Sequence, residues 1–318
     1  MFDKIIVGNG QIRPFFRFLL SVVGILTVIT SVAFIVVKMP PIEHLDHRIS
    51  LLFWYNLLML PSLLALYMLL TRLLEQRPLA SVGLAFYGRW INELGIGLVA
   101  GAGMIVAVAC LERLLGVARF SLTPVSPEKV VIAGVFLFAL LAVAAVDEEL
   151  VFRGYPFQRL VDSGGPLAAV AAISVLFGVT HLGNPFHTWI STANTILVGV
   201  LLAVCYLRTR ALWLPIGVHF AWNYFQGYVL GFPVSGLTLP EPILAARIRG
   251  PVWLTGGAYG PEGSILTLGI IFAGTVYFLL TRRIYITREM RELALGPGTG
   301  GKGENAVALG TAVPTEKP

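Results

Sequence analysis

Charged residues are scarce in this sequence. Lys, Arg, Asp and Glu together make up 13% of its 318 residues, whereas about 25% is usual for a soluble domain. Hydrophobic residues make up 56% of the chain, and the mean hydropathy is +0.81. This balance excludes an ordinary soluble protein and indicates an integral membrane protein whose main partner is the lipid bilayer.

Cysteine is also rare. The two cysteines, Cys110 and Cys205, lie in apolar runs, so they provide neither a disulfide framework nor a metal site. The net charge of +6 is concentrated in short basic clusters between apolar runs and near the C-terminus, such as Arg282 and Arg283. Basic clusters in these positions anchor membrane proteins, so we expect no nucleic-acid partner.

Eight runs are apolar enough, and close enough to the roughly 20 residues of a membrane-spanning helix, to be candidate spans. They cover residues 18–37, 51–70, 92–110, 130–160, 166–182, 189–207, 211–229 and 264–281. The first is too long for a signal peptide and no small-residue cleavage site follows it, so we expect it to be retained. The predicted fold is an all-α, polytopic transmembrane helical bundle formed by residues 1–295.

The distribution of positive charge predicts the orientation of this bundle. Lys and Arg are more frequent in the segments that share a side with the N-terminus, which favours both termini in the cytoplasm. The compact loops favour a prokaryotic plasma membrane as the location. Residues 296–318 are rich in Gly, Thr and Pro and lack apolar periodicity, so we expect a disordered cytoplasmic tail there.

Three clusters of polar residues interrupt the apolar runs, although an ionisable side chain at membrane depth costs about 2.5–3.5 kcal/mol. In the first cluster, Glu149 and Arg153 are four residues apart on one helix face, where they can neutralise each other. Glu148 points about 140° away from Arg153 and has no cation of its own. This arrangement favours Glu148 as a general base and Glu149 with Arg153 as a structural pair.

The other two clusters contain the remaining candidate residues. His181 ends an otherwise apolar run, and His219 and Asn223 share one helix face in a later run. Measured along the helices from predicted turns on one side of the membrane, all four candidates lie about 12–22 Å deep. Each residue also has an ordinary structural explanation. Glu148 could face interfacial water at the end of its helix, and His181 could form a hydrogen bond within the core. His219 and Asn223 could form hydrogen bonds between helices. Their common depth favours a single intramembrane pocket.

The three motifs resemble those of a known family. They are Glu148-Glu149-x-x-x-Arg153, Phe177-x-x-x-His181 and His219-x-x-x-Asn223, in that order. Together they resemble the signature motifs of the CPBP family, which comprises type II CAAX prenyl endopeptidases and the related bacteriocin-processing and immunity-associated (Abi) proteins. The resemblance covers about residues 130–230. The Gly-rich stretch 257–263 also resembles a segment that precedes the last span in bacterial members.

The resemblance implies a helical membrane fold with a catalytic cavity open toward the cytoplasm. It also implies endopeptidase activity near the C-terminus of membrane-associated proteins or peptides, which are prenylated CAAX proteins in the eukaryotic and archaeal relatives. Glu148 and His181 would activate the attacking water, and His219 and Asn223 would donate hydrogen bonds to the oxyanion. The Glu149–Arg153 pair would support the site.

Two mechanisms fit these residues. In the favoured one no metal takes part and Glu148 is itself the general base. In the other, Glu148, His181 and His219 bind Zn²⁺ and leave a coordination position for water, although the sequence has no His-Glu-x-x-His helix.

Two other classes of function remain open. A non-catalytic protein that binds a membrane peptide or lipid, such as a bacteriocin-immunity protein, would be compatible with the same residues. A transporter is less favoured, because the sequence has no internal repeat of the kind found in many transporters.

Overall fold

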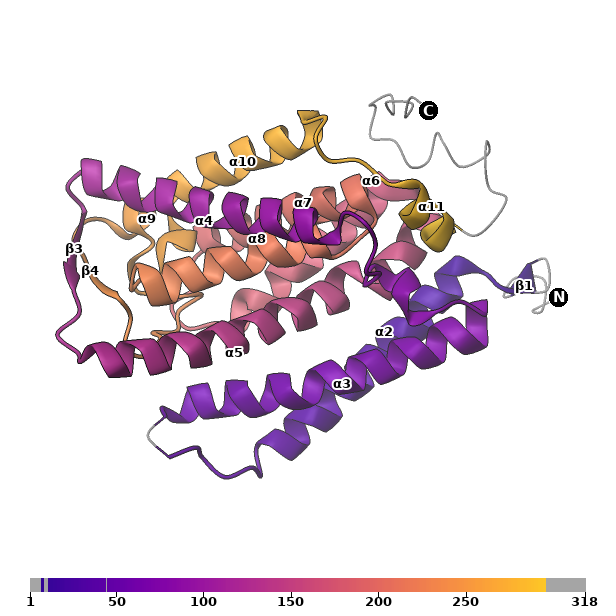
Figure 1. The fold of residues 1–318 in the computed structure, drawn as a ribbon, viewed down its shortest axis with the longest axis horizontal. Helices are drawn as coiled ribbons and strands as arrows, with labels where there is room; N and C mark the ends of the chain where they lie inside the picture. The colour runs from indigo at the N-terminus through magenta and orange to yellow at the C-terminus, as the bar shows by residue number, and fades with distance from the viewer. Residues whose placement is uncertain (1–6, 9–10, 44, 296–318) are drawn as a thin grey trace.

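The computed structural model describes residues 7–8, 11–43 and 45–295 and consists of long helices packed into a bundle (Figure 1). The predicted disordered tail, 296–318, lies outside the described residues. The main helices are α2 (Pro14–Val36), α3 (His47–Glu75), α4 (Trp90–Leu114), α5 (Pro127–Arg153), α6 (Tyr155–Thr180), α7 (Trp189–Thr209), α8 (Trp213–Tyr224) and α10 (Ile265–Leu280).

Short elements close the two ends of the bundle. They are β1 (Val7–Gly8), β2 (Gln11–Ile12), η1 (Leu79–Val82), β3 (Ala118–Leu122), η2 (His181–Gly183), η3 (Phe225–Val229), β4 (Leu244–Ile248), α9 (Val252–Thr255), η4 (Gly257–Tyr259), η5 (Pro261–Gly263) and α11 (Arg288–Leu295). Strands β3 and β4 pair antiparallel, with Phe120 opposite Ala246. They lie at the end of the bundle away from β1 and α11 (Figure 1).

The helical membrane bundle expected from the sequence is confirmed. Among the described residues, five stretches are long and apolar enough to cross a membrane, and Ile265–Leu280 is a shorter apolar helix. The five are Pro14–Val36, His47–Glu75, Trp90–Leu114, Pro127–Gly183 and Trp189–Thr209. The stretch Pro127–Gly183 contains both α5 and α6. The number of spans, about eight, stays a prediction.

The expectation of one continuous helix over residues 130–160 is wrong. Helix α5 ends at Arg153, because Gly154 adopts φ −72° and ψ −137° and the chain turns there. Pro156 follows in the first turn of α6, where the absence of its N–H costs no hydrogen bond. A second break occurs at Gly165, whose φ of 81° is readily reached only by glycine, just before Pro166. The polar cluster of α5 therefore lies in the last two turns of its helix.

Helix α8 lies at the centre of the bundle, in contact with α4, α5 and α7. Glycines allow α4 and α8 to approach closely: a Cβ atom on Gly97 would lie 2.4 Å from the carbonyl oxygen of Leu214, and one on Gly101 would lie 2.2 Å from that of Val218. Small residues four apart are a common way for membrane helices to pack backbone against backbone. This contact holds α8, which carries His219, close against α4.

We predict that Gly101→Val destabilises the protein. The added side chain would collide with the α8 backbone and force the two helices apart, at a cost of about 1–3 kcal/mol or more. The thermal midpoint of the purified protein in detergent measures this loss. Gly103→Val is the matched control, because nothing lies within 4 Å of a Cβ atom at Gly103. Equal midpoints for the two variants would contradict the packing argument.

Candidate active site

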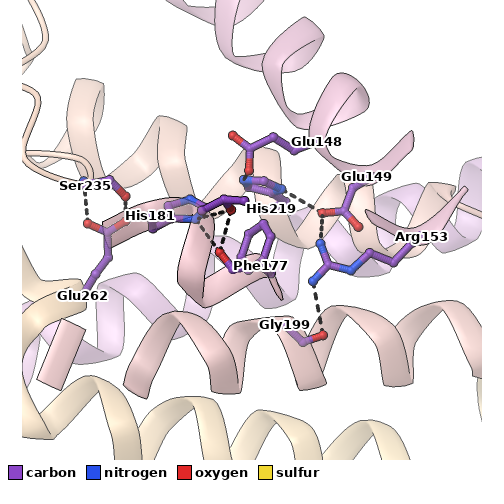
Figure 2. Close-up of polar contacts among 10 residues, drawn as sticks. Glu148, Glu149, Arg153, Phe177, His181, Gly199, His219, Ser235 and Glu262 are labelled. Atoms are coloured by element: carbon purple, nitrogen blue, oxygen red, sulfur yellow. Dashed lines mark hydrogen bonds and ion pairs between the residues drawn. The ribbon is translucent and has the colours of Figure 1, made fainter. Parts of the chain in front are cut away.

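The C-terminal part of α5, the end of α6 and the middle of α8 meet inside the bundle (Figure 2). Helix α5 supplies Glu148, Glu149 and Arg153, and α8 supplies His219. Phe177 lies in the last turn of α6, and His181 follows directly in η2. The residues come from three separate sequence motifs, and Figure 2 shows their side chains gathered in one region.

The carboxylate of Glu149 is the common partner of two cationic or polar groups. Its Oε1 lies 3.2 Å from Nη1 of Arg153 and 2.9 Å from Nδ1 of His219. The side chains of Glu149 and Arg153 are both completely buried. Arg153 also donates from Nη2 to the carbonyl oxygen of Gly199 on α7, at 3.2 Å. One carboxylate thus joins α5 to α8, while its guanidinium partner joins α5 to α7.

This contact determines which way the His219 ring faces. A carboxylate paired with an arginine is ionised and can only accept a hydrogen bond, so Nδ1 of His219 is the donor. Nε2 is the ring nitrogen left for other partners. It lies 3.8 Å from Oε2 of Glu148, and Figure 2 shows the Glu148 carboxylate directed toward the ring. The ring is oriented as in a carboxylate–histidine pair that presents its second nitrogen to a ligand.

Glu148 differs from Glu149 in its surroundings. Its side chain is 40% exposed, whereas that of Glu149 is buried. Its Oε2 has no hydrogen-bond partner among the described residues. The structure therefore separates two adjacent carboxylates into one that is held by an arginine and one that is open to a ligand.

His181 is held by its own helix. Its Nδ1 lies 2.7 Å from the carbonyl oxygen of Phe177, and because a carbonyl only accepts, Nδ1 carries the proton. Nε2 of His181 therefore has a lone pair and can accept a hydrogen bond. The ring packs on that of Phe177, with the ring centres 4.7 Å apart.

The ring of Phe177 contacts side chains from all three motifs. It lies edge-on to His219, with centres 6.4 Å apart, and 4.5 Å below the guanidinium carbon of Arg153. Phe152 packs edge-on against its other side at 4.9 Å. Phe177 has no chemistry of its own to contribute, but it sets the spacing between the two histidines.

Asn223 lies one helical turn beyond His219 on α8 and is half-buried. Its side chain makes no hydrogen bond with any described residue. Its amide is available to a ligand, and the structure shows no direct contact that ties it to either carboxylate.

The loop between α8 and α10 adds a residue that the sequence analysis did not select. Glu262 in η5 accepts hydrogen bonds from the backbone N–H of Ser235, at 2.7 Å, and from Nε2 of Gln226, at 2.8 Å. Burial raises the pKa of Glu262, while these hydrogen bonds and the nearby His181 oppose the shift. Figure 2 shows Glu262 and Ser235 beside His181. The Gly-rich stretch 257–263 was the sequence signal for this residue.

Within the described part of the chain, no group of three or more His, Cys, Asp or Glu side chains is gathered closely enough to hold a metal ion. Nδ1 of His219 and Nδ1 of His181 are both engaged, and Nε2 of each ring remains for a ligand. The zinc alternative stays a prediction.

Comparison with known proteins gives one family match. Residues 131–225 match the family model described as type II CAAX prenyl endopeptidase Rce1-like. This segment contains all three motifs and confirms the resemblance seen in the sequence, whereas Glu262 lies outside it. The chain matches no curated protein and no solved structure.

We predict that Arg153→Met is strongly destabilising, because it leaves the Glu149 carboxylate buried without its arginine, at a cost of about 3–5 kcal/mol. The double variant Glu149→Leu with Arg153→Met removes both charges and should recover at least half of that loss. Titration with a denaturing detergent measures the free energy of unfolding.

The control for this comparison is Glu292→Gln. Glu292 forms an ion pair with Arg288 that has the same i,i+4 spacing but lies on the surface. Loss of this exposed pair should change the free energy of unfolding little. A double variant no more stable than Arg153→Met would show that the buried pair is not the source of the effect.

Proposed function

Residues 131–225 belong to the type II CAAX prenyl endopeptidase Rce1-like family, and from this premise we propose that the protein is an intramembrane endopeptidase. It hydrolyses a peptide bond near the C-terminus of a membrane-associated protein or peptide. Glu148, His181, His219 and Asn223 carry out the reaction, and Glu149 and Arg153 hold the site in place.

The observation that carries this proposal is the separation of the two adjacent carboxylates. Glu149 is buried and bound to both Arg153 and His219. Glu148 is partly exposed, has no arginine partner and lies 3.8 Å from Nε2 of His219. This difference suits a general base, because pairing with an arginine makes a carboxylate a weaker proton acceptor. A purely structural ion-pair network would have no use for the second carboxylate.

The first step is the activation of water. Nε2 of His181 carries a lone pair and accepts one hydrogen bond from the water, which orients it. Glu148 takes the proton as the water oxygen attacks the carbonyl carbon of the scissile peptide. Such positioned general-base catalysis contributes about 10²–10⁴ in rate.

The second step is the stabilisation of the tetrahedral oxyanion. Nδ1 of His219 donates to Glu149, and in this step Nε2 of the same ring also carries a proton and donates it to the oxyanion. The amide of Asn223, one turn further along α8, provides the second donor. Each such donor lowers the barrier by roughly 3–4 kcal/mol in other peptidases. Glu148 then returns its proton to the leaving amine as the C–N bond breaks.

The substrate class follows from the family and from the setting. Type II CAAX prenyl endopeptidases act near the C-terminus of lipid-modified proteins, and a site between apolar helices suits a substrate anchored in the membrane. The substrate is therefore a membrane-associated polypeptide, prenylated or unmodified. With both termini in the cytoplasm, its scissile bond would be delivered from the cytoplasmic side of a plasma membrane.

We predict that Glu148→Gln and His181→Ala each reduce cleavage by about 10²–10⁴-fold, because each removes a group that activates water. Asn223→Ala should lower kcat about 10²-fold or more with little change in KM. Purified variants in liposomes are assayed with a fluorogenic peptide ending in a CAAX sequence, in farnesylated and unmodified forms.

His187→Ala is the matched histidine control, since His187 is exposed in the loop after η2. Full activity of a folded Glu148→Gln variant would contradict the assignment of Glu148 as the general base. Binding of the peptide without turnover by the wild-type protein would favour the non-catalytic binder instead.

We predict that activity survives removal of divalent metals, because Glu148 acts on water directly. The wild-type enzyme is incubated with EDTA or 1,10-phenanthroline, dialysed and assayed with the same peptide. Loss of activity that Zn²⁺ restores, and that Mg²⁺ does not, would replace the metal-free mechanism with the zinc alternative.

A further inference from the structure

The ribbon formed by β3 and β4 has one face against the bundle and one face turned outward. Phe120 and Ala246 lie opposite each other in the register, and both pack against the buried apolar core. The ring of Phe120 lies edge-on to that of Phe232, with the ring centres 5.4 Å apart. Because successive side chains of a strand alternate between its two faces, Arg119 and Arg247 lie on the outward face.

Three arginines share this outward face. Arg119 lies directly opposite Arg247. Arg249 continues the same alternation just after β4, where its backbone N–H donates to the carbonyl oxygen of Val117 at 2.8 Å. Side chains directly opposite each other have Cβ atoms about 4.5–5.5 Å apart, and like charges in this position destabilise the strand pair. The register therefore builds a like-charge repulsion into the ribbon.

No described residue neutralises these three arginines. All three are exposed, and their side chains form no hydrogen bond or ion pair with any residue that the structure describes. The segments 112–129 and 241–255 together contain five Lys or Arg and three Glu. One of the three, Glu112, is completely buried in α4. The outward face thus presents uncompensated positive charge, which an anion with several acceptor oxygens would complement.

The ribbon lies where a candidate membrane span ends. Helix α4 ends at Leu114, four residues before β3 begins at Ala118, and β3, β4 and α9 lie at the same end of the bundle (Figure 1). Leu114 is 82% exposed, Leu122 at the end of β3 is 76% exposed, and Trp253 in α9 is 54% exposed. Exposed apolar and Trp side chains beside basic ones are typical of a surface that lies in the headgroup layer of a membrane.

We propose that Arg119, Arg247 and Arg249 bind the phosphate group of an anionic phospholipid. A phosphate between Arg119 and Arg247 replaces one repulsion by two attractions, because each guanidinium can donate to its oxygens. The acyl chains lie beside Leu114 and Leu122. An acidic polypeptide would match the arginines but not the exposed leucines. The three arginines take no part in the proposed hydrolysis, so the test does not depend on activity.

The test places a reporter on the same face of the ribbon. Ser121 is exposed, lies two residues from Arg119 and is opposite Ala245. Full-length Ser121→Cys is labelled with bimane in a Cys110→Ser background, because Cys110 is exposed whereas Cys205 is buried. Bimane fluorescence in detergent is titrated with dioleoyl phosphatidylglycerol, and with dioleoyl phosphatidylcholine as the lipid of no net charge. Only phosphatidylglycerol should saturate the signal.

Three sets of substitutions in this labelled protein make the result specific. Arg119→Gln with Arg247→Gln and Arg249→Gln should raise the half-saturating phosphatidylglycerol concentration roughly 100-fold, the effect of three cations at a membrane surface. Lysine at the same three positions keeps the charge and should retain most of the binding. The control, Arg72→Gln with Arg282→Gln and Arg283→Gln, removes three exposed arginines near the ends of α3 and α10 and should leave the titration unchanged.

The cross-strand repulsion gives a second measurement. Without phospholipid, Arg119→Gln should raise the thermal midpoint in detergent, because it removes the like-charge pair. Saturating phosphatidylglycerol should then raise the midpoint of the wild type more than that of Arg119→Gln, since a ligand stabilises the form that binds it more tightly. This pattern also shows that the variant is folded.

Two results would overturn the proposal directly. They are equal half-saturation by phosphatidylglycerol and phosphatidylcholine, and an unchanged phosphatidylglycerol titration in the glutamine triple variant. Saturation of the signal by soluble poly-glutamate, with no response to phosphatidylglycerol, would also overturn it and would assign the face to an acidic polypeptide.

Discussion

The buried carboxylate of Glu149 is the interaction on which the site depends. It holds Arg153 and His219 at once, so its removal would leave Nδ1 of His219 without a partner and the Arg153 guanidinium buried without a counter-charge. The same contact orients His219 so that Nε2 faces Glu148. The same contact therefore stabilises the bundle and orients residues of the proposed active site.

The surrounding helices make this geometry rigid. The close α4–α8 contact at Gly97 and Gly101 holds the helix that carries His219. The turn at Gly154 ends α5 directly after Arg153 and lets α6 return toward the same region. Glu262 ties the loop after α8 into place beside His181. Each of these contacts restricts the position of a side chain in the proposed active site.

Much of this arrangement could be predicted from residue spacing. Apolar runs located the main helices, and the i,i+4 spacing of Glu149 and Arg153 identified their pairing, because both are local properties of a helix. The bond from Glu149 to His219 was not predictable, since it depends on how α5 and α8 are rotated against each other. The same is true of Glu262, which a loop brings to the site.

Composition and motif order alone were enough to predict a helical membrane bundle and the family whose model matches residues 131–225, because hydropathy and helical periodicity act over a few turns of chain. The partner of His219 and the close contact of α4 with α8 arose only when distant segments packed together. They depend on side-chain contacts between helices whose relative rotation and depth no local pattern encodes.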